Sequence, residues 1–328
     1  MVCRTLIAGA ALFLCGASSA VAADAITFQL GWLPGGERAP VYLGLQRGLF
    51  AAANLDVKIL PGRGSSDVLT KLATHVADIG EVGFDAYIAA KANGALPVTA
   101  VMPYYVKQPD SLLTTVGSGI ESLKDVAGKS VAATPFGTSI LAWPFLLKLN
   151  GVDAASVRLI KADASAIGAM LASGAVDAIF IWGPSVPALE PMLTAAGKQM
   201  KLIPWSRFGY EGYSQTIMAS DKIIAERPEV VGRFLKVFRQ AVQLTHDDPG
   251  AAAQAVKTTV PQADLAVVRA QVDATIPLLI NEISQRDGLG VFNPQLLHKS
   301  WEWVATAHGI AVDKIDPITT VNTRLGGS

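Results

Sequence analysis

One segment of this chain occurs twice, and this repeat constrains the fold more than any other feature. Residues 57–85 read VKILPGRGSSDVLTKLATHVADIGEVGFD, and residues 157–184 read VRLIKADASAIGAMLASGAVDAIFIWGP. Both copies predict a strand, a turn rich in small residues, an apolar helix and a second short strand that opens into a loop. Two copies are too few for a solenoid, which needs at least three stacked repeats. The repeat therefore predicts two similar α/β lobes with a cleft between them.

The first 23 residues have the composition of an export signal. Arg4 supplies the positive charge, residues 6–17 form a short apolar stretch, and residues 20–23 are small, as expected before a cleavage site. The apolar stretch is too short and too rich in Ala and Gly for a membrane-spanning helix. We expect cleavage after Ala22 or Ala23 and a periplasmic mature protein. Lipidation at Cys15 is the less favoured alternative, because the bulky Leu14 precedes it.

Composition excludes several classes of protein. Both cysteines, Cys3 and Cys15, lie in the predicted signal, so the mature chain has no disulfide or thiol chemistry. Lys and Arg number 27 and so do Asp and Glu, and no cluster of basic residues stands out. Nucleic acid is therefore not an expected partner, since binding to phosphates needs clustered positive charge. We expect a soluble monomer after cleavage.

Predicted strands and helices alternate along the chain, which is typical of α/β proteins with mainly parallel sheets flanked by helices. From Pro228 onward the chain is predicted to be mostly helical, with no counterpart in the repeat. We predict a signal peptide over residues 1–23, a first lobe over 24–111 plus 214–328, and a second lobe over 112–213. The two chain crossings, near 105–112 and 209–215, are the expected hinge.

No motif for catalysis or for a metal or cofactor is present. The sequence lacks G-x-S-x-G, H-E-x-x-H and the Lys-Ser/Thr end of a phosphate-binding loop, and its four histidines are scattered. We therefore predict no catalytic residue, no metal and no cofactor. The loops at the carboxyl ends of strands are the expected place of a ligand site, because ligands bind there in open α/β sheets.

Two such loops carry hydroxyl groups where a helix is predicted to begin, Ser65/Ser66 in one lobe and Thr138/Ser139 in the other. Backbone N–H groups and the helix dipole at such ends favour a carboxylate, a sulfonate or a similar anion. Simple capping of the helices by these hydroxyls remains an alternative. Asp85 is either a cap or a ligand contact.

Aromatic residues near predicted loop ends point to a flat or apolar ligand. Packing inside a lobe is the alternative, favoured for Phe136 and Trp143, whereas Trp32 and Trp182 are expected in the cleft. Turn formation explains the repeated Asp78 and Asp177 better than catalysis does. The predicted ligand-binding residues are Trp32, Ser65, Ser66, Phe84, Asp85, Tyr104, Thr138, Ser139, Trp182 and Tyr210. Glu37 and Arg38 are expected to be solvated at a loop tip.

Several short motifs occur in an order that resembles a known family. They are the Trp32 loop, Gly48-Leu49-Phe50, Ala77-Asp78-Ile79-Gly80, residues 123–129 (LKDVAGK) and residues 174–178 (GAVDA). With the export signal, they resemble periplasmic substrate-binding proteins of ABC importers, and more narrowly the NMT1/THI5-like group that handles taurine, alkanesulfonates, nitrate and pyrimidine precursors. Residues 181–190 (IWGPSVPALE) resemble the sulfonate and taurine branch, whereas Trp32 and residues 143–145 resemble the pyrimidine branch.

The resemblance implies a two-lobed fold of periplasmic-binding-protein type II that closes on a small ligand and docks on a membrane permease. It also implies ligand contacts at Trp32, Ser65, Ser66, Phe84, Thr138, Ser139 and Trp182. The resemblance leaves anionic and aromatic molecules as alternative ligand classes.

Two other functions remain as alternatives. The same family contains pyrimidine-synthase enzymes, which rely on His- and Cys-bearing motifs. The Trp32 loop has no His and the mature chain has no Cys, which argues against an enzyme. A ligand-binding input protein for a sensor kinase is the third possibility.

Overall fold

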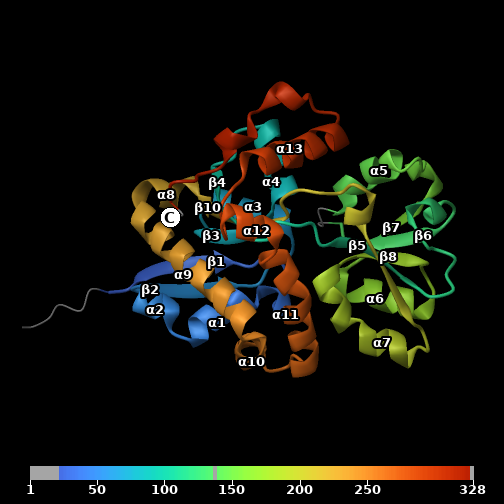
Figure 1. Cartoon of the computed structure of the whole chain (residues 1–328), viewed down its shortest axis with the longest axis horizontal. Helices are drawn as coiled ribbons and strands as arrows, with labels where there is room; N and C mark the ends of the chain where they lie inside the picture. Colours follow the sequence, from blue (N-terminus) through green and yellow to red (C-terminus); the bar gives the residue numbers. More distant parts are fainter. Residues whose placement is uncertain (1–21, 136–138, 326–328) are drawn as a thin grey trace, which may run out of the picture.

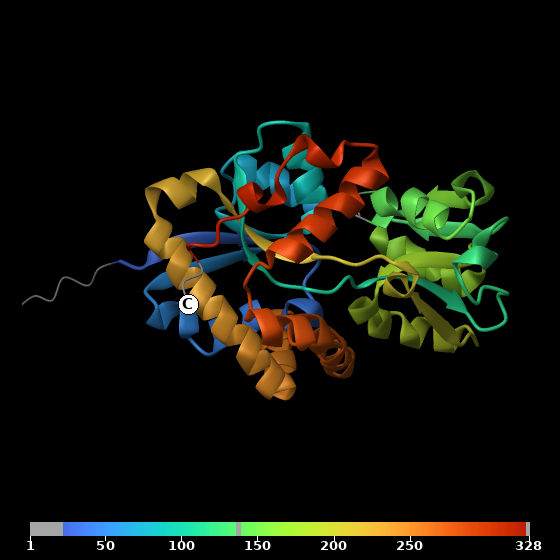
Figure 2. The same cartoon turned by 45° about the horizontal axis from the view of Figure 1, so that its top comes forward.

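The computed structural model describes residues 22–135 and 139–325, and it contains two lobes, each built on one five-stranded sheet (Figure 1). The first lobe carries the sheet of order β2-β1-β3-β10-β4, and the second carries the sheet of order β7-β6-β8-β5-β9. Two separate segments of chain connect the lobes, one within residues 104–109 and one within residues 209–214 (Figure 2). The predicted two-lobed α/β fold is thereby confirmed. Residues 1–21 of the predicted signal lie outside the described residues.

The two sheets have the same order when their strands are matched by position. In the first lobe the strands are β1 (Asp24–Gln29), β2 (Leu55–Leu60), β3 (Ile79–Gly83), β4 (Val98–Pro103) and β10 (Gln215–Ser220). In the second lobe they are β5 (Asp110–Thr115), β6 (Ser130–Ala133), β7 (Arg158–Lys161), β8 (Ala178–Trp182) and β9 (Met200–Pro204). The sequence repeat maps onto this symmetry, since β2-α3-β3 and β7-α6-β8 occupy equivalent places.

Each sheet contains one strand that runs against the others, β10 in the first and β5 in the second. Both are the first strand that the chain enters after crossing from the other lobe. Asp110 pairs with Trp182 and Gln215 with Gly83, so each crossing enters at the carboxyl ends of the parallel strands. A strand that enters at this edge has to run antiparallel to its neighbours. The sheets are mainly parallel, as predicted, and their carboxyl edges face one another across the crossings.

Helices cover both faces of the first sheet. On one face, α1, α9, α10 and α11 form a core that includes a contact between Phe28 and Phe234, with ring centres 5.3 Å apart. On the other face, α3, α4 and α13 pack around Tyr87 and Trp301. The helices are α1 (Ala39–Gln46), α2 (Leu49–Ala52), α3 (Ser65–Ala73), α4 (Phe84–Asn93), α8 (Asp221–Glu226), α9 (Pro228–Asp247), α10 (Pro249–Thr259), α11 (Leu265–Leu279), α12 (Glu282–Asp287) and α13 (Pro294–His308).

The second sheet is covered in the same way. One face packs against α5 (Ser139–Leu149) around Trp143 and Trp205, and the other packs against α6 (Ala164–Ser173) and α7 (Glu190–Ala195). Short 3₁₀ helices connect these elements in both lobes. They are η1 (Gly36–Arg38), η2 (Leu123–Val126), η3 (Ala154–Ser156), η4 (Gly183–Ala188), η5 (Trp205–Phe208), η6 (Val312–Lys314) and η7 (Pro317–Thr320).

The apolar stretch after the first strand forms two helices, α1 and α2. Gly48 adopts a left-handed conformation with φ of 66°, which ends α1 and allows α2 to start in a new direction. Glycine adopts this conformation at little cost, whereas other residues are strained there. The apolar periodicity continues through the break because α1 and α2 bury residues in the same core.

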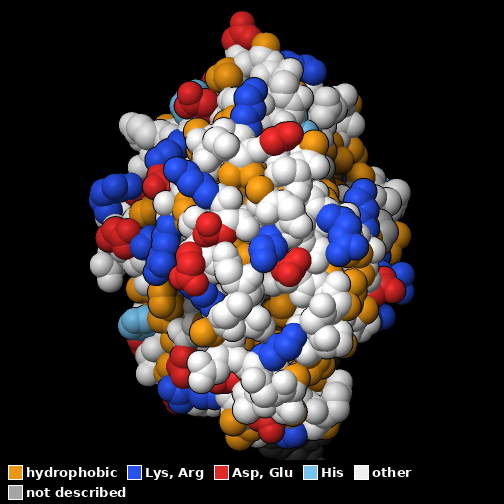
Figure 3. All heavy atoms as spheres, turned by 90° about the vertical axis from the view of Figure 1, so that its right-hand side faces the viewer, with side chains coloured by type: hydrophobic (Ala, Val, Ile, Leu, Met, Phe, Trp, Pro, Cys, Tyr) orange, Lys and Arg blue, Asp and Glu red, His pale blue; other side chains and the backbone are white. Residues whose placement is uncertain are grey.

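Two further features concern membrane-spanning helices and surface charge. No helix in residues 22–135 and 139–325 has the length and apolar character needed to cross a membrane. The face at the second-lobe end of the molecule mixes basic and acidic side chains over its whole area (Figure 3). That mixture fits the charge balance found in the sequence.

Candidate ligand-binding site

A cavity of about 220 Å³ lies between the lobes and is lined from both of them. It sits where the carboxyl edges of the two sheets face each other, which is where open α/β sheets bind ligands. Its apolar wall includes Trp32, Ile167, Phe180, Ile181, Trp182 and Leu189, and its polar groups come from Arg38, Ser65, Thr134, Ser139, Ser185 and Gln215. Predominantly apolar walls with a few polar groups are typical of sites for small organic molecules.

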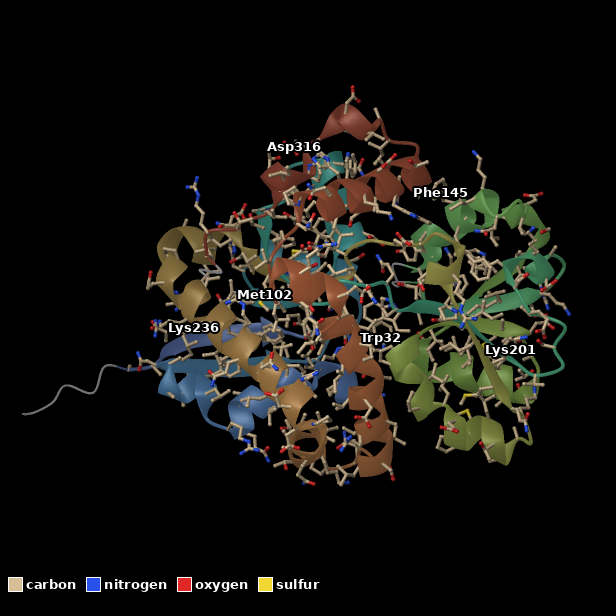
Figure 4. The ribbon with its side chains drawn as sticks, in the orientation of Figure 1. Trp32, Met102, Phe145, Lys201, Lys236 and Asp316 are labelled. Atoms are coloured by element: carbon tan, nitrogen blue, oxygen red, sulfur yellow. The ribbon has the colours of Figure 1, made fainter. Side chains whose placement is uncertain are left out.

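Two indoles face the cavity from opposite lobes. Trp32 follows β1, and it lies at the junction between the lobes (Figure 4). Trp182 ends β8, its indole Nε1 donates a hydrogen bond to Asp110 Oδ1 at 3.2 Å, and its ring centre lies 6.0 Å from that of Tyr105. The Trp182 ring is therefore held by a polar partner on one side and by a first-lobe aromatic on the other. Two indoles from opposite lobes can contact the faces of a flat ligand.

Asp110 organises the wall in which Trp182 lies. Only 1% of its surface is exposed, and its Oδ1 accepts hydrogen bonds from Trp182 and from the Ser139 hydroxyl. Its other oxygen, Oδ2, has no hydrogen-bond partner among the described residues. Burial raises the pKa of Asp110 to about 6, although the bonds from Ser139 and Trp182 oppose that rise. The sequence offered no signal for this residue beyond an acid at the start of a buried strand.

A buried ion cluster lies on the first-lobe side of the cavity. Arg38 Nε is 3.4 Å from Glu81 Oε2, and one terminal nitrogen of Arg38 is 3.5 Å from Glu37 Oε2. All three side chains are buried, and Glu81 also accepts a hydrogen bond of 3.1 Å from the N–H of Gly31. Of the three charged residues, Arg38 lines the cavity. The expectation that Glu37 and Arg38 are solvated at a loop tip is wrong.

The reason for their burial lies far along the chain. The N–H of Gly36 donates a hydrogen bond of 2.9 Å to the side-chain oxygen of Gln271 in α11, which holds η1 against that helix. A Cβ at position 36 would lie 2.4 Å from the carbonyl oxygen of Val268, so only glycine permits this approach. One clue was present in the sequence, because Glu81 interrupts a short predicted strand. A charged residue inside a buried strand is rare unless it is paired.

Burial and pairing act in opposite directions on the pKa values of this cluster. Burial raises the pKa of Glu81, and the positive charge of Arg38 offsets that rise only in part. Burial lowers the pKa of Arg38, but Glu37 and Glu81 outweigh it and raise that pKa above its usual value. Arg38 therefore keeps its charge, and it lies beside two buried carboxyl groups.

Two hydrogen bonds join the lobes beside the cavity. The Ser185 hydroxyl in η4 donates to Glu37 Oε1, and the Tyr210 hydroxyl donates to Asp85 Oδ2 at the start of α4. Burial raises the pKa of Asp85 to about 7, the bond from Tyr210 opposes that rise, and Asp110 adds to it. The lobes are thus connected by side chains as well as by the two chain crossings.

The structure brings four of the ten predicted ligand-binding residues to the cavity lining, Trp32, Ser65, Ser139 and Trp182. Thr138, like Phe136, lies outside the described residues. Asp85 and Tyr210 bond to each other across the lobes. The remaining three are Ser66, which is exposed, and Phe84 and Tyr104, which are buried in the first-lobe core.

Ser65 contributes in a different way from the one expected. The residue that caps α3 is Gly64, which uses no side-chain hydrogen bond, so neither Ser65 nor Ser66 caps this helix. The Ser65 hydroxyl instead accepts a hydrogen bond of 2.9 Å from the N–H of Gly83 at the end of β3. This bond fixes two loops of the first-lobe wall to each other.

The repeated aspartates join strands within each sheet. Asp78 Oδ2 accepts a hydrogen bond of 2.8 Å from the N–H of Thr27 in β1, and Asp177 Oδ2 accepts from the N–H and the hydroxyl of Ser130 in β6, both at 2.7 Å. The prediction of a structural role is confirmed. The expected local turn is wrong, because the bonds reach the neighbouring strand.

Metal or histidine chemistry finds no support in the described part of the chain. No group of three or more His, Cys, Asp or Glu side chains there could hold a metal ion. All four histidines are exposed, and the described cavity lining includes none of them.

Comparisons with known proteins agree with this architecture. Residues 36–252 match the family described as NMT1/THI5 like. The riboflavin-binding protein RibY of Chloroflexus aurantiacus is 23% identical over 290 residues, which is 86% of this chain and 80% of that protein. The 4-amino-5-hydroxymethyl-2-methylpyrimidine phosphate synthase THI13 of Saccharomyces cerevisiae is 27% identical over 236 residues, 69% of this chain and 68% of the enzyme.

A solved structure shares the fold. The periplasmic aliphatic sulphonate binding protein SsuA of Escherichia coli superimposes with a TM-score of 0.72 and 15% identity, covering 93% of this chain and 99% of that protein. At this identity the likeness shows the fold, which is the type II fold of periplasmic binding proteins, and leaves the ligand open. The family match spans more than half of the sequence, and its residues supply both lobes and most of the cavity lining. The chain belongs to the NMT1/THI5-like family.

Proposed function

We propose that this protein is an extracytoplasmic solute receptor that binds a small organic molecule between its lobes and delivers it to an ABC importer. The observation that carries the proposal is the cavity, because each lobe contributes an indole to it and hydroxyl groups come from Ser65 in the first lobe and from Thr134, Ser139 and Ser185 in the second. A site divided between two lobes closes when they approach each other, so ligand binding changes the surface that a membrane permease meets.

Relatives support the binding function without fixing the ligand. Riboflavin is the ligand in the name of RibY, and an aliphatic sulphonate is the ligand class in the name of SsuA. The family resemblance implies a sulfonate-like or taurine-like, a nitrate-like or a pyrimidine-precursor-like ligand. Location in the periplasm is part of the proposal, and it rests on the signal-like composition of residues 1–23.

The second candidate function is synthesis of a pyrimidine precursor, favoured by the identity with the yeast synthase. Against it, neither Cys nor His belongs to the described lining of the cavity, and all four histidines are exposed. Such an enzyme would need a group that transfers protons or forms a bond with its substrate. The described lining offers hydroxyls, an amide and one guanidinium, which suit binding better than chemistry.

A thermal-shift screen of the mature protein tests the proposal. A ligand that binds only the folded state raises the melting temperature by mass action. The screen contains sulfonates, nitrate, pyrimidines, flavins and aromatic acids, and each hit is checked by calorimetry and for chemical change by mass spectrometry. At least one compound should bind and be recovered unchanged. Conversion of a hit to product would favour the enzyme, and the absence of any hit would oppose the receptor.

A further inference from the structure

The positive charge in the lining of the cavity is offset by neighbouring carboxyl groups. Arg38 is the one charged side chain in the described lining. Its guanidinium lies 3.4 Å from Glu81 and 3.5 Å from Glu37, so two carboxylates already surround it. Interactions between buried charges are screened far less than those at the surface. An anion that enters the cavity therefore meets a guanidinium whose charge is offset.

A third buried carboxyl group lies behind the opposite wall. Asp110 supports the side chains of Trp182 and Ser139, which both line the cavity. Glu37, Glu81 and Asp110 are each less than 5% exposed. In the described lining, Arg38 is the one basic residue that could balance these three carboxyl groups, because no other Lys or Arg belongs to it.

The rest of the lining suits an uncharged flat molecule. Trp32 and Trp182 offer the faces of two indoles, and Ile167, Phe180 and Leu189 add apolar surface. The Gln215 amide and the hydroxyls of Ser65 and Thr134 can both donate and accept hydrogen bonds. A ring with N–H groups matches these partners and adds no negative charge.

We infer that the cavity selects an uncharged or cationic aromatic compound with N–H donors, and that Glu81, with Glu37, determines this selectivity by cancelling the charge of Arg38. The inference rests on the proposed receptor function and narrows its ligand. Sulfonates, carboxylates and nitrate are the disfavoured class. Hydroxyl groups at the helix starts of the two lobes suggested an anionic ligand when the sequence was considered alone. The buried carboxyl groups outweigh the attraction of these helix starts for an anion.

Matched acid and amide pairs test this inference directly. Nicotinate with nicotinamide and benzenesulfonate with benzenesulfonamide have nearly the same shape and differ in charge, and they are measured together with the molecule that native mass spectrometry finds retained by the protein. The inference expects the neutral member of each pair that binds to bind at least about tenfold more tightly, and the retained molecule to carry no net negative charge. Preference for the acids, or an anionic retained molecule, overturns it.

Replacement of Glu81 tests whether this residue causes the preference for neutral ligands. Glu81→Gln keeps the shape and removes one negative charge, so the preference for the neutral member should fall by at least about fivefold. Glu282→Gln is the matched control, because Glu282 is an exposed carboxylate paired with Lys107. This variant should prefer the neutral member of each ligand pair as strongly as the wild type does. If Glu81→Gln does not fold, Glu37→Gln removes the other carboxyl group beside Arg38, and its preference is compared with that of Ser185→Ala, which removes the Glu37 contact between the lobes alone. Unchanged preference in a folded variant contradicts the role of the carboxylates.

The outcome also separates this inference from the receptor function. Binding with a preference for anions overturns the inference and leaves the receptor function intact. No retained molecule and no hit in the whole screen overturns both.

Discussion

The hydroxyl of Tyr210 in the second lobe donates a hydrogen bond to the carboxylate of Asp85 in the first. Tyr210 is buried against Trp205 of the second lobe and Trp303 of α13, and Asp85 lies in the first turn of α4 in the first lobe. The bond therefore joins two rigid elements across the hinge. Its strength depends on pH, because burial raises the pKa of Asp85 to about 7.

Stability should fall as pH rises through the range in which Asp85 ionises. The folded pKa is about 7 and the ordinary value is 3.8, so the folded state binds the proton more tightly than the unfolded state does. This contribution is full below pH 4 and is lost as pH rises through 7. Asp85→Asn should remove on the order of 1–3 kcal/mol of this pH dependence, discounted because the side chain is partly exposed. Chemical denaturation of wild type and variant at pH 5 and pH 8 measures it, and parallel curves for the two would contradict the assignment.

The contact between Glu37 and Ser185 should favour the closed arrangement of the lobes. Ser185→Ala removes the donor at this contact and should weaken ligand binding by about 0.5–1.5 kcal/mol. Calorimetry gives the affinity, and small-angle scattering gives the distribution of open and closed forms. Ser206→Ala, at an exposed position of η5 in the same lobe, is the control. Equal affinities in the two variants would show that the contact has no part in closure.

Trp182 should contribute more to ligand binding than any residue of the lobe cores. Trp182→Ala should raise the dissociation constant by an amount equivalent to about 1 kcal/mol or more, as expected for a buried aromatic contact. Trp182→Phe keeps a ring but loses the bond to Asp110, so its effect should be intermediate. Phe292→Leu, in the first-lobe core, should lower the melting temperature and leave the dissociation constant unchanged. The reverse pattern would remove Trp182 from the site.

Asp177 should affect stability alone. Burial opposes ionisation, but hydrogen bonds from Ser130 and the charges of Lys129 and Arg158 lower the pKa of Asp177. A lowered folded pKa means that the stabilisation is present at neutral pH and is lost as pH falls through that pKa. Asp177→Asn should cost about 1–2 kcal/mol at pH 7 and less at pH 3. Denaturation at both pH values checks this, and a change in ligand affinity would contradict the purely structural role.

Much of the fold could be predicted from the sequence, because it depends on local patterns. The repeat predicted two equivalent lobes, and the alternation of strands and helices predicted sheets whose carboxyl edges form the site. Trp32 and Trp182 were expected in the cleft because both lie near a predicted loop end, and both line the cavity.

Other parts depend on contacts between distant residues. Glu37 and Arg38 look like a solvated loop tip until Gly36 is seen to bond to Gln271, 235 positions away. Phe84 and Tyr104 also lie at loop ends, but their rings turn into the first-lobe core, and position along a strand does not determine that direction. Asp110 gains its role from Ser139 and Trp182, which only the folded sheet brings together.

Native mass spectrometry of the mature protein, purified without refolding, shows whether the cavity between the lobes holds a ligand. The wild type should retain a small molecule, and this molecule should be lost when Trp32 and Trp182 are both replaced by Ala, with the variant still folded by circular dichroism. A wild-type protein that carries no small molecule and binds none of the screened compounds, or a double variant that retains the molecule fully, would contradict the claim that this cavity is the ligand site.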